Sequence, residues 1–332
     1  MTSTIPKAIV PGLRKMIVDG MSQIPDYVGL VGNVLSSSKH REIDQDYAGL
    51  TKFTAVGENG ETPYEDPVNG YTTTYTHQTY KDGFQVSKEA LDDNLYADAP
   101  QARRAQMIGQ AFMRTRNSQF FSIFRNAFTA ASTSYGDLKP LASTIHPVPD
   151  ASFTQSNASS TGAVLSHAAL EAGLLAIQQL KDFQGELEGR GSGTVMLIVP
   201  PALRKSATEI LESERVSSEL SNTINVHFAG RQMKTAVAAP SADYFFSTRY
   251  NMKLLICPWI SAAAGGSDTA WYLLEEKNHN INFFDRTGLM ISEEKDFDTD
   301  ALKIKGFARF SYGWSGWKGV YASNGLTTAY SL

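Results

Sequence analysis

Three stretches of the sequence carry residue types that could bind a ligand or catalyse a reaction. Residues 189–193 (GRGSG) hold the glycines of a phosphate-binding loop, residues 296–300 (DFDTD) the spaced carboxylates of a calcium loop, and residues 313–316 (GWSG) a serine between glycines. Glycine-rich backbone cradles phosphate, alternating carboxylates coordinate Ca²⁺, and a serine in a sharp turn is a hydrolase nucleophile. Each pattern is therefore tested against the spacing that its chemistry requires.

None of the three patterns meets that spacing. The glycine segment precedes a predicted strand, whereas a phosphate loop follows a strand and opens a helix with Lys-Ser/Thr. The acidic stretch has Ala301 where a calcium loop has glycine, and Phe307 where it has glutamate. The second glycine of the serine segment comes one residue too early for a nucleophile elbow. We interpret the first two stretches as turns, and the third is not a nucleophile elbow.

Histidine and cysteine add no candidate site. The single cysteine, Cys257, lies in an apolar run and is interpreted as a small core residue. The histidines have no pair at metal-ligand spacing: His40, His77, His146, His167, His227 and His279. We predict no catalytic, cofactor-binding or metal site, and no enzymatic activity. A soluble hydrolase with a triad dispersed along the chain stays a remote alternative.

The composition is that of a globular protein with little charge. Of 332 residues, 42% are hydrophobic and 19% charged, and the formal net charge is −4. This length suffices for one large domain or two ordinary ones. The charge gives no global attraction to nucleic acid or anionic lipid. One cysteine excludes an intrachain disulfide, and no stretch is typical of a signal peptide or membrane helix.

The first 85 residues predict segments that lie on something else. Residues 1–45 alternate short apolar runs with proline and glycine, which indicates an extended arm; a frayed terminus is the alternative. Residues 46–85 predict a polar β-hairpin from β-prone residues 51–56 and 70–80. The second stretch, GYTTTYTHQTY, has no aliphatic residue, so we expect neither face to supply much core. A projecting hairpin of this kind is marginal alone and would rest on a neighbouring subunit, with a surface hairpin on a monomer as the alternative.

The strongest helical signal covers residues 98–128. Asp98 is the expected N-cap, with Gln101 as capping-box partner and Pro100 in the first turn. Apolar residues recur at helical spacing, and the helix would be about 45 Å long. Gly109 is interpreted as a site at which this helix could bend.

The remaining chain predicts an α/β block and a long closing strand. Ser166 caps a predicted helix that runs to Leu180, and Pro200-Pro201 begins another over residues 202–214. Residues 302–312 alternate apolar with mostly basic residues, which predicts a long strand with one basic face or edge. The other predicted strands are 194–199, 224–228, 253–257 and 270–274.

The order of these elements resembles the major capsid proteins of tailed bacteriophages, the Hong Kong ninety-seven fold, and most nearly the phage Mu-type major head subunit family. The resemblance covers most of residues 46–325 and depends on the order of its motifs rather than on any one of them. The motifs are residues 80–96 (YKDGFQVSKEALDDNLY), 143–147 (STIHP), 195–203 (VMLIVPPAL), 271–274 (WYLL) and 309–321 (RFSYGWSGWKGVY).

The resemblance implies an α+β phage major capsid fold with a defined domain map. Residues 1–45 would be the N-arm and residues 46–85 the E-loop, a hairpin lying over the adjacent subunit. Residues 86–164 and 269–332 would form the P-domain, with spine helix 98–128 and long β-strands. Residues 165–268 would be the α/β A-domain, whose tip meets its counterparts around the capsomer centre.

The resemblance also implies a function and a set of partners. Such chains form hexamers and pentamers that close into an icosahedral head around double-stranded phage DNA, enclosed without sequence-specific binding. Portal and scaffolding proteins, and a decoration protein, are expected partners; a membrane is not. The expected location is the virion, after assembly in the bacterial host cytoplasm. The weak net charge agrees, because a strongly basic lining would hinder the movement of DNA.

Two departures and two alternatives limit the resemblance. Because the hairpin begins near residue 46, scaffolding would come from a separate protein or from an uncleaved short arm. Lys52 and Asn69 lie near the hairpin, but nothing identifies them as a reactive pair, so no crosslink is predicted. The alternatives are an encapsulin-like shell subunit around protein cargo and, more remotely, a tail or adhesin module that binds through the tyrosine-rich hairpin.

The arm-and-hairpin interpretation yields a set of residues expected at contacts between subunits. They are polar, aromatic or basic residues of the hairpin, the long helix and the closing strand. The candidates are Lys52, Glu58, Asn59, Tyr64, Tyr71, Tyr75, Arg103, Arg114, Arg309, Trp314 and Trp317.

Overall fold

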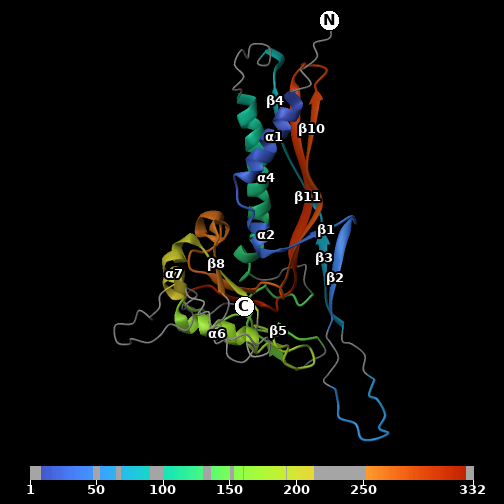
Figure 1. Cartoon of the computed structure of the whole chain (residues 1–332), viewed down its shortest axis with the longest axis vertical. Helices are drawn as coiled ribbons and strands as arrows, with labels where there is room; N and C mark the ends of the chain where they lie inside the picture. The colour runs from blue at the N-terminus through green and yellow to red at the C-terminus, as the bar shows by residue number, and fades with distance from the viewer. Residues whose placement is uncertain are drawn as a thin grey trace, which may run out of the picture. The chain divides into compact units, whose positions relative to one another are not determined.

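The structure, a computed structural model, divides into two compact units. The first consists of Met1–Glu42, Tyr75–Phe120 and Asn282–Gly313, and the second of Ile43–Thr74, Phe121–Ile281 and Trp314–Leu332. Figure 1 traces the chain and labels its elements. The residues described are 9–47, 53–64, 69–89, 100–129, 136–149, 153–159, 161–191, 193–212 and 252–326.

The first unit is built on a four-stranded sheet with the order β1-β10-β11-β4. Its strands are β1 (Asn33–Ser36), β10 (Asn280–Lys295), β11 (Leu302–Gly316) and β4 (Gln78–Val86). Strand β4 runs antiparallel to β11, with Leu302 opposite Val86 and Phe310 opposite Gln78. Strand β1 runs parallel to β10. The sequence does not predict β10, because its apolar and polar residues alternate only over part of its length.

The predicted closing strand is confirmed, together with its two faces. Along β11, Leu302 and Ile304 are buried, whereas Lys303 and Lys305, which alternate with them, are exposed. Helices α1 (Ile9–Ser22) and α4 (Pro100–Phe120) lie side by side along this sheet (Figure 1). Their shared core contains Ile17, Ala105, Ile108, Leu302 and Ile304, with Met16, Phe84, Leu289 and Ile291 packed against it.

Helix α1 touches α4 at two glycines, and this changes the interpretation of Gly109. A Cβ added at Gly109 would lie 2.1 Å from the carbonyl oxygen of Ile17, and one added at Gly20 would lie 2.2 Å from that of Gln106. Helix α4 continues through Gly109 without a break. The glycine therefore permits the close approach of two backbones and does not mark a bend in this structure.

The expectation of an extended arm over residues 1–45 is wrong for the part of the chain described. Besides α1, this part forms α2 (Tyr27–Val31) and β1. The Asp26 carboxylate caps α2 by accepting from the Gly29 N–H at 3.2 Å, and it pairs with Arg116 of α4 at 2.9 Å. Proline and glycine misled the prediction because Gly20 lies at the contact between α1 and α4, and Pro25 follows the end of α1 with its carbonyl accepting from the Asn117 side chain.

The long helix is shorter than the predicted 98–128 and ends at Phe120. A turn at Phe121 separates α4 from the short helix α5 (Ser122–Arg125). Phe120 packs on Phe283 in the first unit, with ring centroids 6.3 Å apart, and Phe121 packs on Phe124 in the second, at 5.6 Å. Successive aromatic residues thus belong to different cores, which helical periodicity does not reveal. The expected N-cap, Asp98, lies outside the described residues.

The second unit contains a mixed four-stranded sheet with the order β12-β9-β7-β8. Its strands are β12 (Val320–Ser323), β9 (Trp271–Glu275), β7 (Val195–Val199) and β8 (Met252–Ile256). Strand β7 is buried at every position and runs parallel to β8 and antiparallel to β9. This confirms three predicted strands, while predicted strand 224–228 lies outside the described residues.

Helices cover this sheet as the sequence predicted. Helix α6 (His167–Gln178) begins at Ser166, whose hydroxyl accepts from the Ala169 N–H. Pro201 opens the short 3-10 helix η1 (Pro201–Leu203), which leads into α7 (Arg204–Glu212). The shared core includes Leu170, Leu174, Val195, Leu197, Ile210, Trp271 and Leu273. Short elements complete the unit: η2 (Pro258–Ile260), η3 (Ala262–Ala264), β5 (His146–Pro147) and β6 (Thr154–Gln155).

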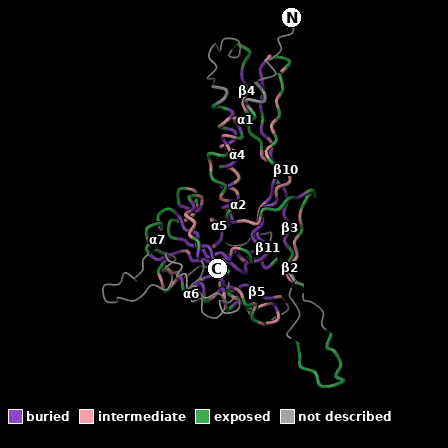
Figure 2. The backbone as a smooth tube through the Cα atoms, viewed as in Figure 1, coloured by how far each residue is buried: buried purple, intermediate pink, exposed green. Residues whose placement is uncertain are grey.

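The predicted hairpin is present with different strands. The pair consists of β2 (Arg41–Tyr47) and β3 (Asn69–Thr76), and β4 joins the sheet of the first unit instead. Residues 53–64, which include most of predicted strand 51–56, have no regular secondary structure and are exposed throughout (Figure 2). The expectation that 70–80 supplies little core is wrong, because Thr73 and Tyr75 are buried and the Tyr75 ring packs on Phe284 at 4.8 Å.

Among the described residues, no helix is long and apolar enough to cross a membrane.

The contact at Gly109 yields a stability prediction. We expect Gly109→Ala to destabilise the protein by about 1–3 kcal/mol, although alanine favours an isolated helix, because its methyl group would force α1 from α4. Urea unfolding measures this difference. Met107→Ala on the same helix, where the side chain is 60% exposed, is the control and should change stability little. A stabilising Gly109→Ala would contradict the observed packing.

Candidate assembly surfaces

In the glycine-rich segment, the described residues 189–191 are held in place by an ion-pair network. Gly189 and Gly191 have φ of +66° and +78°, which glycine adopts without strain. The Gly191 N–H donates to Glu275 at 3.0 Å, and Arg190 donates to the Asn278 carbonyl and pairs with Glu188. These contacts fasten the turn to the end of β9, so its glycines and charges serve the fold.

The acidic stretch 296–300 is likewise a turn whose carboxylates are bound by lysines. Asp296 pairs with Lys303, and Asp300 pairs with Lys295 at 2.6 Å. The paired lysines lower the pKa of both carboxyl groups. Within the described ranges, no three His, Cys, Asp or Glu side chains are grouped to hold a metal ion.

His77 contacts two serine hydroxyl groups, but these serines, the histidine and a nearby carboxylate are not arranged as in a catalytic triad. The His77 ring lies 3.0 Å from both the Ser37 and the Ser311 hydroxyl oxygens, and Ser37 donates to Glu42 at 2.6 Å. In a hydrolytic triad the carboxylate orients the histidine, whereas here it holds the serine. His77 is also only 5% exposed. This chain of hydrogen bonds joins the start of β4 to β11 and to the residues after β1.

A second histidine centre is closed entirely. His146 lies 2.7 Å from an Asp137 carboxylate oxygen and 3.2 Å from the Asn157 side-chain oxygen, and its ring stacks on Trp317 at 4.4 Å. Asn157 also donates to the Leu141 carbonyl and accepts from the Ser143 N–H. With His146 fully buried, no substrate can reach the ring. The motif 143–147 thus holds a loop of the second unit in place through the hydrogen bonds of Ser143 and His146.

Two further titratable groups are buried in the second unit. Burial raises the pKa of the Cys257 thiol to about 12, which keeps it protonated and unreactive at neutral pH. Burial lowers the pKa of His279 to about 4, so its ring is neutral, and the Ile281 N–H donates to its Nδ1 atom. Both groups therefore act as core residues.

Several predicted contact residues lie on the surface. Glu58 and Asn59 occupy an exposed turn that the Gly60 N–H closes on the Gly57 carbonyl, and Tyr64 is 93% exposed. Arg103 and Arg114 are exposed on α4. Tyr71 and Arg309 are half-buried, and Lys52 lies outside the described residues. Whether these side chains meet another subunit stays a prediction.

Three predicted contact residues are corrected. Tyr75, Trp314 and Trp317 are only 2%, 5% and 2% exposed within the chain itself. A buried side chain offers no surface to another subunit, so these three are core residues. Their aromatic character, which suggested an interface, serves internal packing instead.

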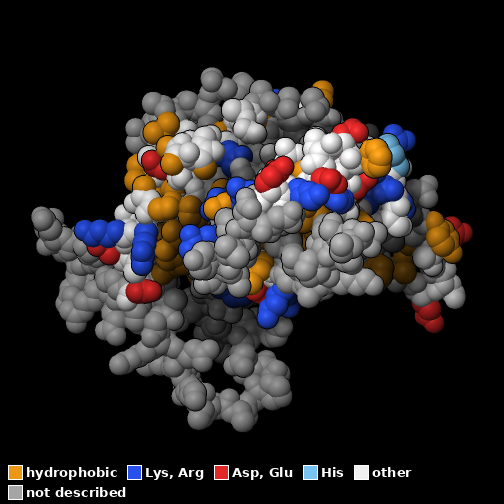
Figure 3. Space-filling view, turned by 90° about the horizontal axis from the view of Figure 1, so that it is seen from above, with side chains coloured by type: hydrophobic (Ala, Val, Ile, Leu, Met, Phe, Trp, Pro, Cys, Tyr) orange, Lys and Arg blue, Asp and Glu red, His pale blue; other side chains and the backbone are white. Residues whose placement is uncertain are grey.

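Two exposed aromatic residues are absent from the predicted contacts. Phe53 is fully exposed in the segment between β2 and β3, and Phe297 is 97% exposed between β10 and β11. For Phe297, a signal exists in the sequence, because a phenylalanine inside an acidic turn cannot belong to a core strand. Among the described side chains on the face seen in Figure 3, charged ones of both signs and hydrophobic ones are interspersed, without a continuous field of one sign.

Comparison with known proteins identifies the class to which this fold belongs. A family model described as phage capsid protein matches residues 70–323, which is more than half of the chain. The chain therefore belongs to the phage capsid protein family. No curated protein matches it.

Solved capsid structures share the fold at low sequence identity. The structure titled Mycobacterium phage Patience gives a TM-score of 0.55 at 13% identity, covering 100% of this chain and 91% of that one. The mature capsid of bacteriophage PhiM1 gives 0.54 at 10% identity, covering 88% and 84%. The capsid of Cyanophage P-SCSP1u gives 0.54 at 9% identity, covering 90% and 87%.

These findings confirm the tailed-phage capsid resemblance, the predicted fold class and the function of a major capsid protein. Family and fold define a structural protein of the phage head. The encapsulin-like alternative is not favoured, since the matching family is that of phage capsids. The nearer resemblance to Mu-type head subunits and the domain boundaries stay predictions.

The buried His279 yields a prediction for pH dependence. Its pKa of about 4 lies below the unfolded value of 6.5, so folding favours the neutral ring. The associated stability, roughly 3 kcal/mol, is complete above pH 6.5 and is lost as pH falls toward 4. Urea unfolding across this window should show a shallower decline for His279→Asn than for the native chain. Parallel curves would contradict the assignment.

Proposed function

We propose that this chain is the subunit of an icosahedral phage head, assembling as hexamers and pentamers around double-stranded DNA. The observation that carries the proposal is the family match over residues 70–323. A segment of the chain supports the proposal, because it exposes side chains suited to contact with another subunit and buries none of them within its own subunit.

That segment is 53–64, between β2 and β3. It presents Phe53 and Tyr64, which are 102% and 93% exposed, with Glu58 and Glu61 between them. Large aromatic side chains are enriched at interfaces, and leaving two of them in water forfeits the gain from burial. We infer that this segment lies on a neighbouring subunit, with Glu58, Asn59 and Tyr64 among its contacts.

The other proposed partners follow from the role of a head subunit. A portal and a scaffolding protein would direct assembly in the bacterial cytoplasm, and a decoration protein could bind the finished shell. The formal net charge of −4 suits enclosure of DNA without sequence-specific binding.

We also propose that the chain has no catalytic activity. Its two histidine centres support this, since one is fully buried and the other places its carboxylate on serine rather than on histidine.

Electron microscopy of the purified chain, expressed with and without a co-encoded scaffold, tests the proposed function. We expect closed particles or ring-shaped capsomers. A chain that stays monomeric in both preparations would contradict the proposal, and particles filled with an enzyme instead of DNA would favour a cargo compartment.

A loop replacement tests the role of residues 57–64. We expect a glycine-serine segment of equal length to leave the free energy of unfolding nearly unchanged, because every replaced side chain is exposed, but to suppress particle formation. Urea unfolding and electron microscopy measure the two effects. The control is Leu187→Ser, at an exposed position of the second unit, which should assemble normally. If the replacement unfolds the subunit, the loop belongs to its core.

A further inference from the structure

Asn59 stands directly before Gly60 in the exposed segment 53–64. The Gly60 N–H donates to the Gly57 carbonyl at 2.9 Å and closes a turn, in which Asn59 has a φ of +66°. Both residues are exposed, and among the described residues no side chain forms a hydrogen bond or an ion pair with either of them. The Asn59 amide group and the Gly60 nitrogen therefore both lie in water, one residue apart.

An asparagine followed by glycine carries both partners of a spontaneous reaction. The backbone nitrogen of the glycine can attack the side-chain amide carbon of the asparagine, which closes a succinimide ring. Glycine has no Cβ that would shield its nitrogen or restrict the backbone during ring closure. Asparagine is one of the thermolabile residues of proteins. Whether an Asn-Gly pair reacts then depends on how firmly the fold holds it.

Few contacts hold the turn 57–60. Segment 53–64 has no regular secondary structure, and every residue in it is exposed. A Cβ added at Gly57 would meet nothing within 4 Å, and one added at Gly60 would meet only Gly57 and Val56 of the same segment. A backbone segment with few contacts opens at low free-energy cost. The hydrogen bond of the Gly60 nitrogen can thus exchange for one with water, which frees that nitrogen for attack.

The sequence contains two other Asn-Gly pairs, and the first of them is packed tightly. Asn69 and Gly70 begin strand β3. A Cβ added at Gly70 would lie 2.8 Å from both the Asp46 carbonyl oxygen and the Phe183 ring. This backbone therefore has no room for the rearrangement that ring closure requires.

The second of these pairs, Asn324 and Gly325, is held by hydrogen bonds. The Asn324 side-chain oxygen accepts from the Leu326 N–H at 2.9 Å, and the Gly325 N–H donates to the Ser323 hydroxyl at 3.3 Å. A Cβ added at Gly325 would lie 1.9 Å from the Thr269 carbonyl oxygen. Both reacting groups of this pair are thus engaged within the fold.

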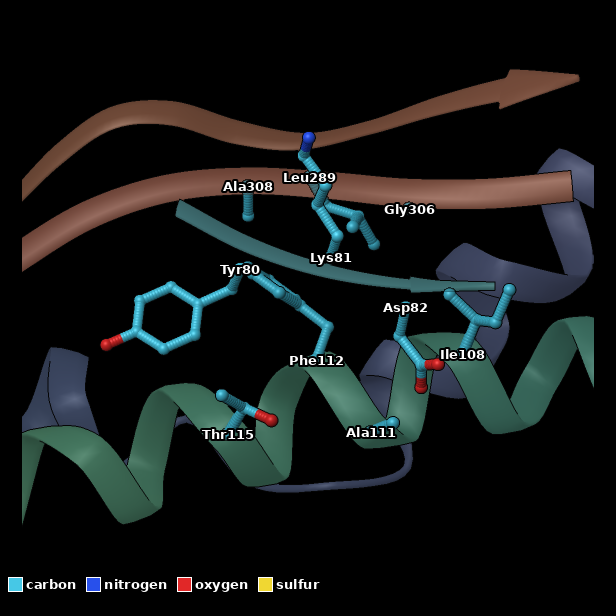
Figure 4. A pocket seen from close by; sticks show the side chains of 10 residues that line it. All are labelled: Tyr80, Lys81, Asp82, Ile108, Ala111, Phe112, Thr115, Leu289, Gly306 and Ala308. Carbon is cyan, nitrogen blue, oxygen red and sulfur yellow. The ribbon is translucent and has the colours of Figure 1, made fainter. Parts of the chain in front are cut away.

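An Asp-Gly pair of the first unit, which could close the same ring, is also held. Asp82 projects from β4 toward α4, beside a pocket that Ile108 and Ala111 line (Figure 4). Its carboxylate accepts from the Gly83 N–H at 2.8 Å, and a Cβ added at Gly83 would lie 2.6 Å from the Ile304 carbonyl oxygen of β11. Ring closure here would separate β4 from β11, so this pair is an internal control.

We propose that Asn59 is a site of spontaneous deamidation, selected by the freedom of its turn. The Gly60 nitrogen gives its proton to water and bonds to Cγ of Asn59, the Cγ–Nδ2 bond breaks, and Nδ2 leaves as ammonia. Water then opens the succinimide at one of its two carbonyl carbons. Opening at Cγ gives aspartate at position 59. Opening at the backbone carbonyl carbon gives isoaspartate, in which the main chain runs through Cβ and Cγ.

Either product changes the surface of segment 53–64. Both products add a negative charge beside Glu58 and Glu61, and isoaspartate also lengthens the main chain. The proposed function places this segment on a neighbouring subunit, and the effect on assembly rests on that proposal. A turn packed against a neighbour cannot open to form the ring, whereas the turn of a free subunit continues to react. The reaction therefore limits the time for which an unassembled subunit stays able to assemble.

Peptide mapping by mass spectrometry tests the site. The purified, unassembled chain is incubated at neutral and at alkaline pH, both folded and in urea. We expect the folded chain to convert at position 59, and faster at alkaline pH because the attacking nitrogen must lose its proton. The pairs 69–70, 324–325 and 82–83 should stay unchanged in the folded chain, whereas the unfolded chain should convert at all three Asn-Gly pairs.

A variant with a shielded nitrogen is the matched control. Gly60→Ala should slow the conversion by about tenfold or more, because its methyl group stands beside the attacking nitrogen. Two results would overturn the proposal: a folded chain that keeps Asn59 intact while the unfolded chain loses it, or a folded chain that converts equally at position 69.

Assembly before and after the same incubation tests the consequence. The native chain should form fewer particles after incubation, and Asn59→Asp should assemble as poorly when fresh. Asn59→Gln, whose longer side chain closes a ring more slowly, should assemble equally well before and after. Full assembly by the converted chain, or equal conversion in particles and in free subunits, would overturn the proposed effect. A native chain that never forms particles contradicts the proposed function, while conversion at position 59 still supports the site.

Discussion

The first unit depends on the contact between the backbones of α1 and α4. Gly20 and Gly109 bring the two helices together until no room is left for a methyl group at either position. Only at this separation can Ile17 reach Ala105 and Ile108 while both helices stay on the inner face of β11. The N-terminal segment thus becomes part of the core, and the Asp26–Arg116 pair and the Asn117–Pro25 hydrogen bond fix the turn that follows.

The sequence predicts those parts of the fold in which the residue pattern of a helix or strand depends only on that element. The alternation in β11, the fully apolar β7 and the Ser166 cap of α6 are local features, and all three appear as expected. The failures concern residues whose role is set by a distant partner. Gly109 and Gly20 read as helix breakers in the sequence, but in the structure each lies against the backbone of the other helix. Phe120 and Phe121 read as part of one apolar helix face, but their rings pack in different cores.

The predicted contact residues also divide into those whose exposure the sequence predicts and those whose burial it does not predict. Exposure of Glu58, Asn59 and Tyr64 could be predicted, because a polar, glycine-rich stretch has nothing to bury. Burial of Tyr75 and Trp317 could not, because an aromatic residue suits an interface and a core equally well, and only the stacking on Phe284 and His146 decides. The polar networks around His77 and His146 were also unforeseen, since their members are dispersed along the chain. They satisfy buried polar groups that would otherwise destabilise the fold.

The burial of Cys257 has a consequence for a shell made of many copies. Each copy brings one sulfhydryl group, and each is enclosed in its own subunit with a pKa of about 12. Such a shell can pass from reducing to oxidising surroundings without gaining or losing a disulfide bond between its subunits. Its cohesion then does not change with the redox state of the medium through this cysteine.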